Sequence, residues 1–119
     1  MSNPPTFEEE RARLQELVLE KGSRTTKRFF NLDQAAYRDG ALTARTKELL
    51  GLVASTVLRC DDCITYHLLR TQELGYSADE IREALDVALI VGGSITIPHV
   101  RRAYGVLEEG VAEGDGAAE

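Results

Sequence analysis

Four residues between positions 48 and 67 have the side chains that reversible thiol chemistry requires. The chain contains two cysteines, Cys60 and Cys63, which form a C-x-x-C motif. His67 follows Cys63 by four residues, and Glu48 precedes Cys60 by twelve residues in a largely apolar stretch. Two thiols can cycle between a reduced pair and a disulfide, and an imidazole and a carboxylate can supply a base and an acid. The combination predicts a chemically active dithiol.

The spacing of the cysteines and His67 is typical of one face of an α-helix. Cys63 and His67 would be one helical turn apart, and Cys60 would be close enough to Cys63 for a disulfide. If Cys60 lies in the first turn of that helix, the unpaired N–H groups and the helix dipole favour its thiolate. Asp61 and Asp62 act in the opposite direction, because nearby negative charge disfavours a second anion. The sequence leaves open which effect is larger.

Glu48 can reach this motif only if the chain reverses direction. On one continuous helix, the twelve residues to the first cysteine would span roughly 18 Å at ~1.5 Å per residue. A break near Leu58–Arg59, between two antiparallel helices, would instead bring Glu48 level with residues 67–70. Glu48, His67 and Cys63 would then form a line of carboxylate, imidazole and thiol, the arrangement of an activated nucleophile. The alternative is that Glu48 is a first-turn charge that faces water.

The C-x-x-C motif also has metal-binding and structural interpretations. A zinc ion requires four ligands, for which the chain offers Cys60, Cys63, His67 and then only His99 or carboxylates. A second C-x-x-C or an H-x-x-x-H is absent from the sequence, so we expect no metal site. Two inert core thiols and a packed histidine are further alternatives, and His99, beside Pro98, is interpreted as a surface or capping residue. A thioredoxin fold is not expected, because its motif follows a strand in an α/β pattern.

Composition predicts one folded domain, residues 1–119, in the cytoplasm. Apolar residues make up 43% of the chain and charged residues 29%, which is typical of a globular protein. The net charge of −6 and the lack of a basic cluster argue against nucleic acid or an anionic membrane as a partner. No apolar run approaches the ~20 residues of a membrane span, and the N-terminal sequence lacks the features of a signal peptide. Residues 1–5 and 110–119 are expected to be a flexible arm and a flexible tail.

Helical patterns and capping signals cover the rest of the chain. Thr6 with Glu9 and Ser77 with Glu80 form capping boxes. No alternating strand pattern occurs, so we predict an all-α fold of about six helices with the C-x-x-C at the start of a core helix. The pair Phe29–Phe30 is interpreted as core packing, with a contact surface for another subunit as the alternative. The helices are expected at about residues 6–21, 24–39, 43–57, 60–74, 77–91 and 98–108, the last with Ser94 or Thr96 as its cap.

The motif and its flanking segments resemble a known family. The pattern of Glu, eleven residues, Cys-x-x-Cys, three residues and His is similar to that of the alkyl hydroperoxidase D-like part of the carboxymuconolactone decarboxylase family. The segments GALTARTKELLGLVAS and DEIREALDVALIVGGSITI resemble those before and after the family's thiol site, so the resemblance covers roughly residues 25–107. The family fold is all-α and its members assemble as trimers or hexamers, which implies a homo-oligomer here.

The resemblance also implies catalytic roles. In the redox-active branch the cysteines are a catalytic pair, and the Glu and His form a proton relay to them. These roles correspond to Glu48, Cys60, Cys63 and His67, whereas the decarboxylase branch typically lacks the cysteine pair. Some redox members have a second His between the cysteines, where this chain has Asp62. A negative residue there would make the thiols less acidic or adapt the site to another partner.

Reduction of a peroxide is the function that these observations favour. Glu48 and His67 would draw the proton from Cys63, whose thiolate would attack the peroxide and become a sulfenic acid. Cys60 would condense with it to a disulfide, which an external dithiol donor protein would reduce. The chain would then be a peroxiredoxin-type oxidoreductase that needs no cofactor. The alternatives are a disulfide reductase or adaptor, a lyase acting on a lactone, and a non-enzymatic oligomeric or metal-binding protein.

Overall fold

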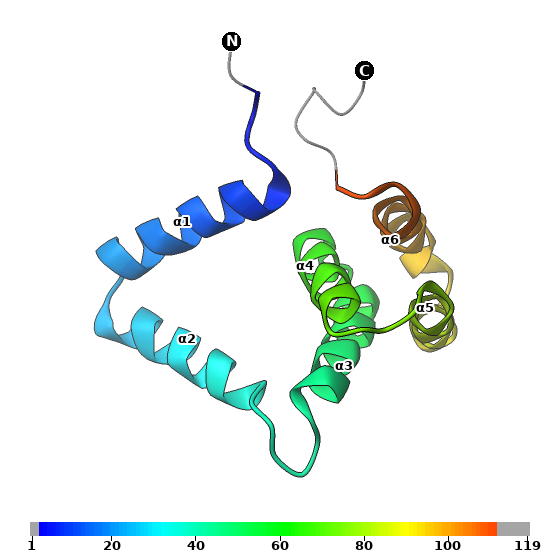
Figure 1. The fold of residues 1–119 in the computed structure, drawn as a ribbon, viewed down its shortest axis with the longest axis horizontal. Helices are drawn as coiled ribbons and strands as arrows, with labels where there is room; N and C mark the ends of the chain where they lie inside the picture. The colour runs from blue at the N-terminus through cyan, green and yellow to red at the C-terminus, as the bar shows by residue number, and fades with distance from the viewer. Residues whose placement is uncertain (1–2, 112–119) are drawn as a thin grey trace. The chain divides into compact units, whose positions relative to one another are not determined.

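The fold is helical throughout the residues that the structure describes. The computed structural model describes residues 3–111, which form six α-helices and one short 3₁₀-helix with no strand among them. The predicted all-α fold is therefore confirmed (Figure 1). Within residues 3–111, no helix combines the length and the apolar character that crossing a membrane requires. The elements are α1 (Phe7–Lys21), α2 (Arg24–Ala36), α3 (Ala44–Val57), α4 (Asp61–Glu73), α5 (Ala78–Gly92), η1 (Ser94–Thr96) and α6 (Ile97–Glu109).

Internal packing divides the chain into two units. Among the described residues, the first comprises residues 3–38 with residue 111, and the second comprises residues 39–110. The second unit contains all four candidate catalytic residues, and the expectation of a single domain stays a prediction. Residues 3–5 have no regular secondary structure. Most of the expected tail, residues 112–119, lies outside the described residues.

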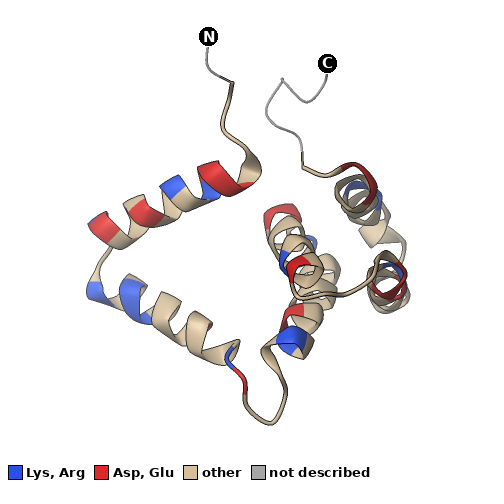
Figure 2. Ribbon diagram, viewed as in Figure 1, with Lys and Arg blue, Asp and Glu red and all other residues tan. Residues whose placement is uncertain are grey.

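In the first unit, α1 begins as its sequence predicts. The Thr6 hydroxyl accepts a hydrogen bond from the Glu9 N–H at 3.1 Å, and the Glu9 carboxylate accepts one from the Thr6 N–H at 3.0 Å. These reciprocal bonds satisfy two N–H groups that the helix itself leaves unpaired. Acidic residues predominate along α1, whereas basic residues gather at the start of α2 (Figure 2).

α2 differs from its prediction in length and in burial. The helix ends at Ala36 rather than near residue 39, because Asp39 turns away to accept a hydrogen bond from Ala44 N–H at the start of α3, at 2.7 Å. Neither α1 nor α2 contains a buried residue. Phe29 is 65% exposed and its ring meets the Phe30 ring in a T-shaped arrangement, so the interpretation of Phe29 as a core residue is wrong. Within the described part of its unit, α2 has only α1 to pack against.

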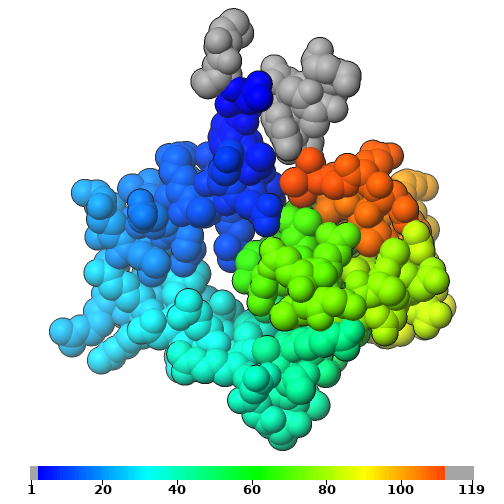
Figure 3. Space-filling view, in the orientation of Figure 1, coloured from blue at the N-terminus to red at the C-terminus, as the bar shows by residue number. Residues whose placement is uncertain are grey.

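The second unit is built on the pair α3 and α4, against which α5 and α6 pack. Figure 3 shows α4, α5 and α6 as a continuous surface on this face of the unit. Burial of apolar side chains from all four helices is the main stabilising contribution. The buried hydroxyl of Thr56 donates to the carbonyl of Leu52 at 2.8 Å, so a polar group in the core is satisfied. The core residues are Leu52, Ile64, Leu68, Ile81, Leu85 and Ala103.

A tight reversal joins α3 to α4 and confirms the predicted break near Leu58–Arg59. α3 ends at Val57, and Arg59 has φ 63°, the left-handed conformation that reverses the chain. The Cys60 N–H then donates to the carbonyl of Ser55 at 3.1 Å, which ties the turn to the last turn of α3. Cys60 itself is the N-cap of α4, so the C-x-x-C lies at the start of a core helix as predicted.

The link between α5 and α6 is more elaborate than its sequence predicts. α5 begins at the predicted Ser77 capping box and is followed by Gly93, whose φ of 80° favours glycine. Ser94 and Thr96 were expected to cap α6, but neither does so through its side chain, because they form η1. The Thr96 hydroxyl instead donates to the carbonyl of Gly93 at 2.8 Å, and Pro98 occupies the first turn of α6.

Candidate redox site

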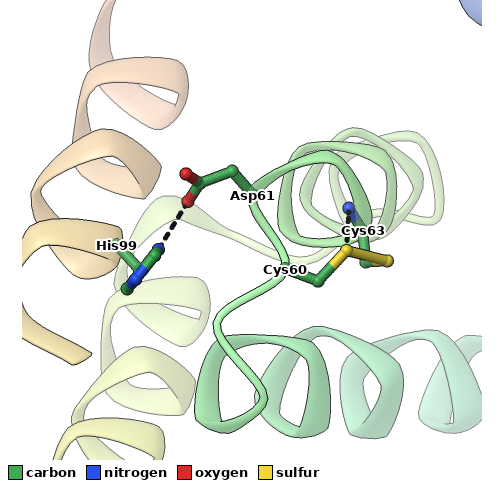
Figure 4. Close-up of a disulfide and its surroundings, with 4 residues drawn as sticks. All are labelled: Cys60, Asp61, Cys63 and His99. Atoms are coloured by element: carbon green, nitrogen blue, oxygen red, sulfur yellow. Dashed lines mark hydrogen bonds and ion pairs between the residues drawn. A yellow bond between two sulfur atoms is a disulfide. The ribbon is translucent and has the colours of Figure 1, made fainter. Parts of the chain in front are cut away.

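Cys60 and Cys63 are joined by a disulfide at the N-terminus of α4. Their Cα atoms are 5.2 Å apart, within the usual range for a disulfide. The Cys60 sulfur also accepts a hydrogen bond from the Cys63 N–H at 3.3 Å, so a sulfur atom takes the place of the oxygen in an ordinary helix cap (Figure 4). Cys63 is exposed and Cys60 is half-buried. A solvent reactant therefore has its more open approach to Cys63.

Glu48 and His67 meet inside the second unit. The carboxylate of Glu48 lies 2.8 Å from Nδ1 of His67, and the two residues are only 5% and 9% exposed. When the Glu48 carboxylate is ionised it can only accept, so Nδ1 then donates in this hydrogen bond and Nε2 is the ring nitrogen left for proton transfer. Glu48 is thus a buried acid held against an imidazole. The alternative of a first-turn charge that faces water is wrong for this residue.

The reversal at Arg59 explains how residues far apart in sequence come together. Because α4 returns alongside α3, Glu48 faces the turn of α4 that carries His67 and Arg70. The sequence analysis predicts this pairing, because an antiparallel helical hairpin places Glu48 level with residues 67–70. Cys63 lies one turn before His67 on α4, and the rings of Tyr66 and His67 pack in a T-shaped arrangement with 5.2 Å between their centroids.

Arg70 is a site residue that the sequence analysis missed. Its Nε lies 4.0 Å from the second carboxylate oxygen of Glu48, and its guanidinium also pairs with Glu73. The hydrogen bond with Glu73 is the largest cause that raises the pKa of Arg70, and the Glu48 carboxylate adds to it. Arg70 is therefore a positive charge beside the carboxylate oxygen of Glu48 that does not bond to His67. Its spacing of three residues from His67 was the signal that could have identified it.

The first turn of α4 carries a second ionic cluster. Asp61, the residue after Cys60, accepts from Nδ1 of His99 at 2.8 Å and from Arg102 at 3.0 Å. Both donors come from α6, and Figure 4 shows the Asp61 carboxylate directed toward His99. The His99 side chain is 18% exposed and bonds to Asp61 of α4, so its interpretation as a capping residue is wrong. Its role depends on where α6 crosses α4, which its local sequence does not reveal.

Metal binding gains no geometric support in this region. Among the described residues, no group of three or more His, Cys, Asp or Glu side chains is arranged to hold a metal ion. Of the zinc ligands considered from the sequence, Cys60 and Cys63 bond to each other, and His67 and His99 bond to separate carboxylates. What the site can do chemically is break and form a disulfide beside a buried acid and base.

The fold and the site together define an all-α thiol protein whose C-x-x-C disulfide begins a core helix next to a buried Glu–His pair. A model of the carboxymuconolactone decarboxylase family matches residues 24–109, and the chain belongs to this family. The resemblance predicted from the motif and its flanking segments is therefore confirmed.

Relatives of known structure share this fold. A carboxymuconolactone decarboxylase family protein from Thermotoga maritima, for which a part in an antioxidative response has been suggested, is 65% identical with a TM-score of 0.82 over 87% of each chain. A family member from Legionella pneumophila is 28% identical with a TM-score of 0.75 over 87% of this chain and 92% of its own. Among curated proteins, "Uncharacterized protein 4 in cox locus" of Paracoccus denitrificans is 32% identical over 68% of this chain and 73% of its own.

Proposed function

We propose that the chain is a thiol-dependent peroxidase or disulfide oxidoreductase of the alkyl hydroperoxidase D-like type. In this proposal, Glu48 and His67 relay protons to the dithiol of Cys60 and Cys63. The observation that carries it is the buried 2.8 Å hydrogen bond between Glu48 and His67, one helical turn from the disulfide. A buried acid–imidazole pair is a costly choice for packing alone, because apolar residues of similar volume would often stabilise the fold as well. The suggested antioxidative part of the Thermotoga maritima relative agrees with this proposal.

The reaction begins with the reduced dithiol. His67, oriented by Glu48, takes the proton of the Cys63 thiol, and the thiolate attacks one oxygen of the peroxide. The O–O bond breaks, the Cys63 sulfur becomes a sulfenic acid, and the other oxygen leaves as an alcohol or water with the proton that His67 returns. The Cys60 thiol then displaces hydroxide from the sulfenic sulfur, and a disulfide and a water molecule form.

An external dithiol protein completes the cycle. One of its thiolates attacks the disulfide, its second thiol resolves the mixed disulfide, and it leaves oxidised while Cys60 and Cys63 regain their electron pair and protons. The net reaction converts a peroxide and a dithiol into an alcohol, water and a disulfide. We place this cycle in the cytoplasm, where reducing conditions keep donor thiols available.

Cys63 is the proposed attacking residue for two reasons. It is exposed, whereas Cys60 is half-buried, and it lies one turn from His67 on the same helix. Cys60 lies beside it at the N-cap, where the helix dipole favours negative charge on sulfur. This position suits Cys60 as the thiol that attacks second, because its sulfur needs to move only a short distance to reach the sulfenic acid of Cys63.

We also propose that the functional form is a homo-oligomer, a trimer or a hexamer. The supporting observation is an exposed apolar strip on α5 and η1, in which Ile90 is 84% exposed and Val91 is 68% exposed. Val87 and Ile95, at 54% and 59% exposure, extend the strip. Clustered apolar exposure of this kind is typical of a surface that another protein covers.

Peroxide consumption with dithiothreitol as the electron donor tests the redox proposal. We expect the wild-type protein to reduce tert-butyl hydroperoxide in proportion to dithiothreitol oxidised, and Cys63→Ser to abolish this turnover. In Cys60→Ser the sulfenic acid should persist and react with dimedone, which adds a defined mass to the protein. Mass spectrometry of the oxidised wild-type protein should show the loss of two hydrogens that the intramolecular disulfide requires.

The outcomes separate the alternatives. Peroxide turnover that survives in Cys63→Ser contradicts the assigned attacking residue. If peroxide leaves both thiols reduced while the protein still exchanges with a disulfide substrate, the chain is a disulfide reductase rather than a peroxidase. Thiols that neither oxidise nor exchange would overturn the proposed function altogether.

A further inference from the structure

The ionic cluster of Asp61, His99 and Arg102 includes a sequence neighbour of Cys60 but faces away from the cysteine pair in space. Asp61 is the first residue of α4, immediately after Cys60. His99 and Arg102 both donate to its carboxylate, at 2.8 and 3.0 Å. In Figure 4 the carboxylate and the disulfide leave the start of α4 on opposite sides. The cluster therefore does not touch the reacting sulfurs, and any influence on them is electrostatic.

Negative charge is concentrated where the thiolate would form. Without compensation, the carboxylate next to Cys60 would oppose a thiolate and offset part of the favourable helix dipole. His99 and Arg102 supply donors, and Arg102 a full positive charge, to that carboxylate. The adjacent Asp62 is exposed, so water screens its charge better. Besides the cysteines, the charged and titratable residues between positions 59 and 70 are Arg59, Asp61, Asp62, Tyr66, His67 and Arg70. Glu48 on α3 contacts His67 and Arg70, and His99 and Arg102 on α6 contact Asp61.

We propose that His99 and Arg102 act through Asp61 as a charge-balancing cluster that sets how readily the Cys60–Cys63 dithiol carries a thiolate. The inference rests on the proposed function only in requiring that the disulfide can be reduced. His99 and Arg102 are positioning residues in this role, because they bind the carboxylate and not the sulfur. A purely structural tie between α4 and α6 would need the hydrogen bonds but not the positive charge.

The pH dependence of thiol alkylation tests the charge directly. Dithiothreitol reduces the disulfide, breaking the S–S bond as its own thiols close to a cyclic disulfide, and is removed before iodoacetamide is added. We expect Arg102→Gln to move the pH of half-maximal alkylation rate upward by about half a unit, which slows alkylation at neutral pH roughly threefold. Asp61→Asn should move it downward by a similar amount. The double variant, which lacks both charges, should return close to the wild-type midpoint.

Two further variants control for structure and for net charge. Arg102→Lys keeps the charge without the planar guanidinium, so its midpoint should stay with the wild type. Arg101→Gln removes the same charge from the neighbouring residue, which lines a groove with Leu89 and Tyr104 on the α5 side of α6. We expect it to leave the midpoint unchanged. The Arg102 side chain is 61% exposed, so these variants should fold, and salt at molar concentration should shrink the shifts.

Shifts of the same direction in Asp61→Asn and Arg102→Gln would overturn the proposal, because loss of a structural tie affects both alike. An equal shift in Arg101→Gln would also overturn it, since only net charge would then matter. The alkylation assay uses no peroxide, so it is independent of peroxidase activity. If the midpoints shift as expected but the protein does not reduce peroxide, this inference stands and the peroxidase proposal is refuted. A disulfide that dithiothreitol cannot reduce would refute both.

Discussion

Replacement of Glu48 by glutamine is the sharpest test of the buried acid–imidazole pair. Glutamine has nearly the same shape, and its amide oxygen can still accept the hydrogen bond from Nδ1 of His67 that spans 2.8 Å in the wild type. The change therefore removes a charge while keeping the contact. Glu48 is 5% exposed, so water has little access to the site to compensate for the lost charge. Any effect on thiol reactivity must then come from the charge that orients and supports the imidazole.

The expected magnitudes follow from the geometry. A hydrogen bond to a charged group contributes about 1.5–3 kcal/mol and one between neutral groups about 0.5–1.5 kcal/mol, so we expect Glu48→Gln to lower the free energy of unfolding by roughly 1–2 kcal/mol. A positioned base contributes about 10²–10⁴-fold in rate. A free thiol with a pKa of ~8.5 is only a few per cent thiolate at neutral pH, which leaves room for such an effect. We expect peroxide to oxidise the variant about 10²-fold more slowly.

Stopped-flow oxidation of the reduced protein by peroxide, at several pH values, measures this rate. His67→Gln, whose amide can still donate to Glu48, and His67→Ala should slow the reaction to a similar extent. If the two residues act as one unit, the Glu48→Gln/His67→Gln double variant should be little slower than either single variant. Glu73→Gln is the matched control, because Glu73 also pairs with Arg70 but is exposed and does not bind His67. Its rate should equal that of the wild type.

The relay is refuted if Glu48→Gln and His67→Gln both retain the wild-type rate and pH profile while circular dichroism shows a folded protein. A rate loss that parallels a loss of helical signal would instead assign the pair to stability. Equal losses in Glu73→Gln and Glu48→Gln would show that the charge of Arg70, rather than the imidazole, controls the thiol.

Three further predictions concern the scaffold. Arg59→Val should lower the free energy of unfolding by about 1–2 kcal/mol relative to Arg59→Gly in urea titrations, because a β-branched residue is strained at φ 63°. Leu85→Ala should cost about 2–5 kcal/mol, since Leu85 is fully buried, whereas Leu50→Ala, at 54% exposure, should cost far less. Ile90→Lys should convert the proposed oligomer into a monomer by light scattering, and a monomeric wild-type protein at micromolar concentration would contradict that assembly.

The sequence predicted the helical hairpin well because its signals are local. Caps at Thr43 and Cys60 and an interruption at Leu58–Arg59 determine where two helices begin and end. A short connection then forces the helices to be antiparallel neighbours, so the level at which Glu48 meets α4 follows from counting residues. The contact with His67 was predictable for this reason. The C-x-x-C disulfide was predictable from spacing alone, because one turn of one helix brings the sulfurs together.

Contacts that depend on the angle between distant helices were not predictable in this way. His99 lies 38 residues from Asp61, and their meeting requires α6 to cross the start of α4. That crossing is set by the link through Gly93 and η1, whose left-handed and 3₁₀ conformations leave only weak signals in sequence. The prediction that Phe29 packs in the core failed for a related reason. Hydrophobic character identifies a surface that another element should cover, but it does not identify which element covers it.

The same contrast explains why the two histidines differ chemically although each donates Nδ1 to a carboxylate at 2.8 Å. Glu48 is buried, so its bond fixes the imidazole of His67 in one tautomer and in one place on the face of α4 that carries Cys63. Asp61 is partly exposed and accepts from both His99 and Arg102, which suits the charge-balancing role that we propose for this cluster. Burial of the carboxylate, and not the presence of a histidine, is therefore what distinguishes the pair to which we assign the proton relay. Exchanging the surroundings of His67 and His99, rather than the two histidines themselves, would be needed to exchange the roles that we propose for them.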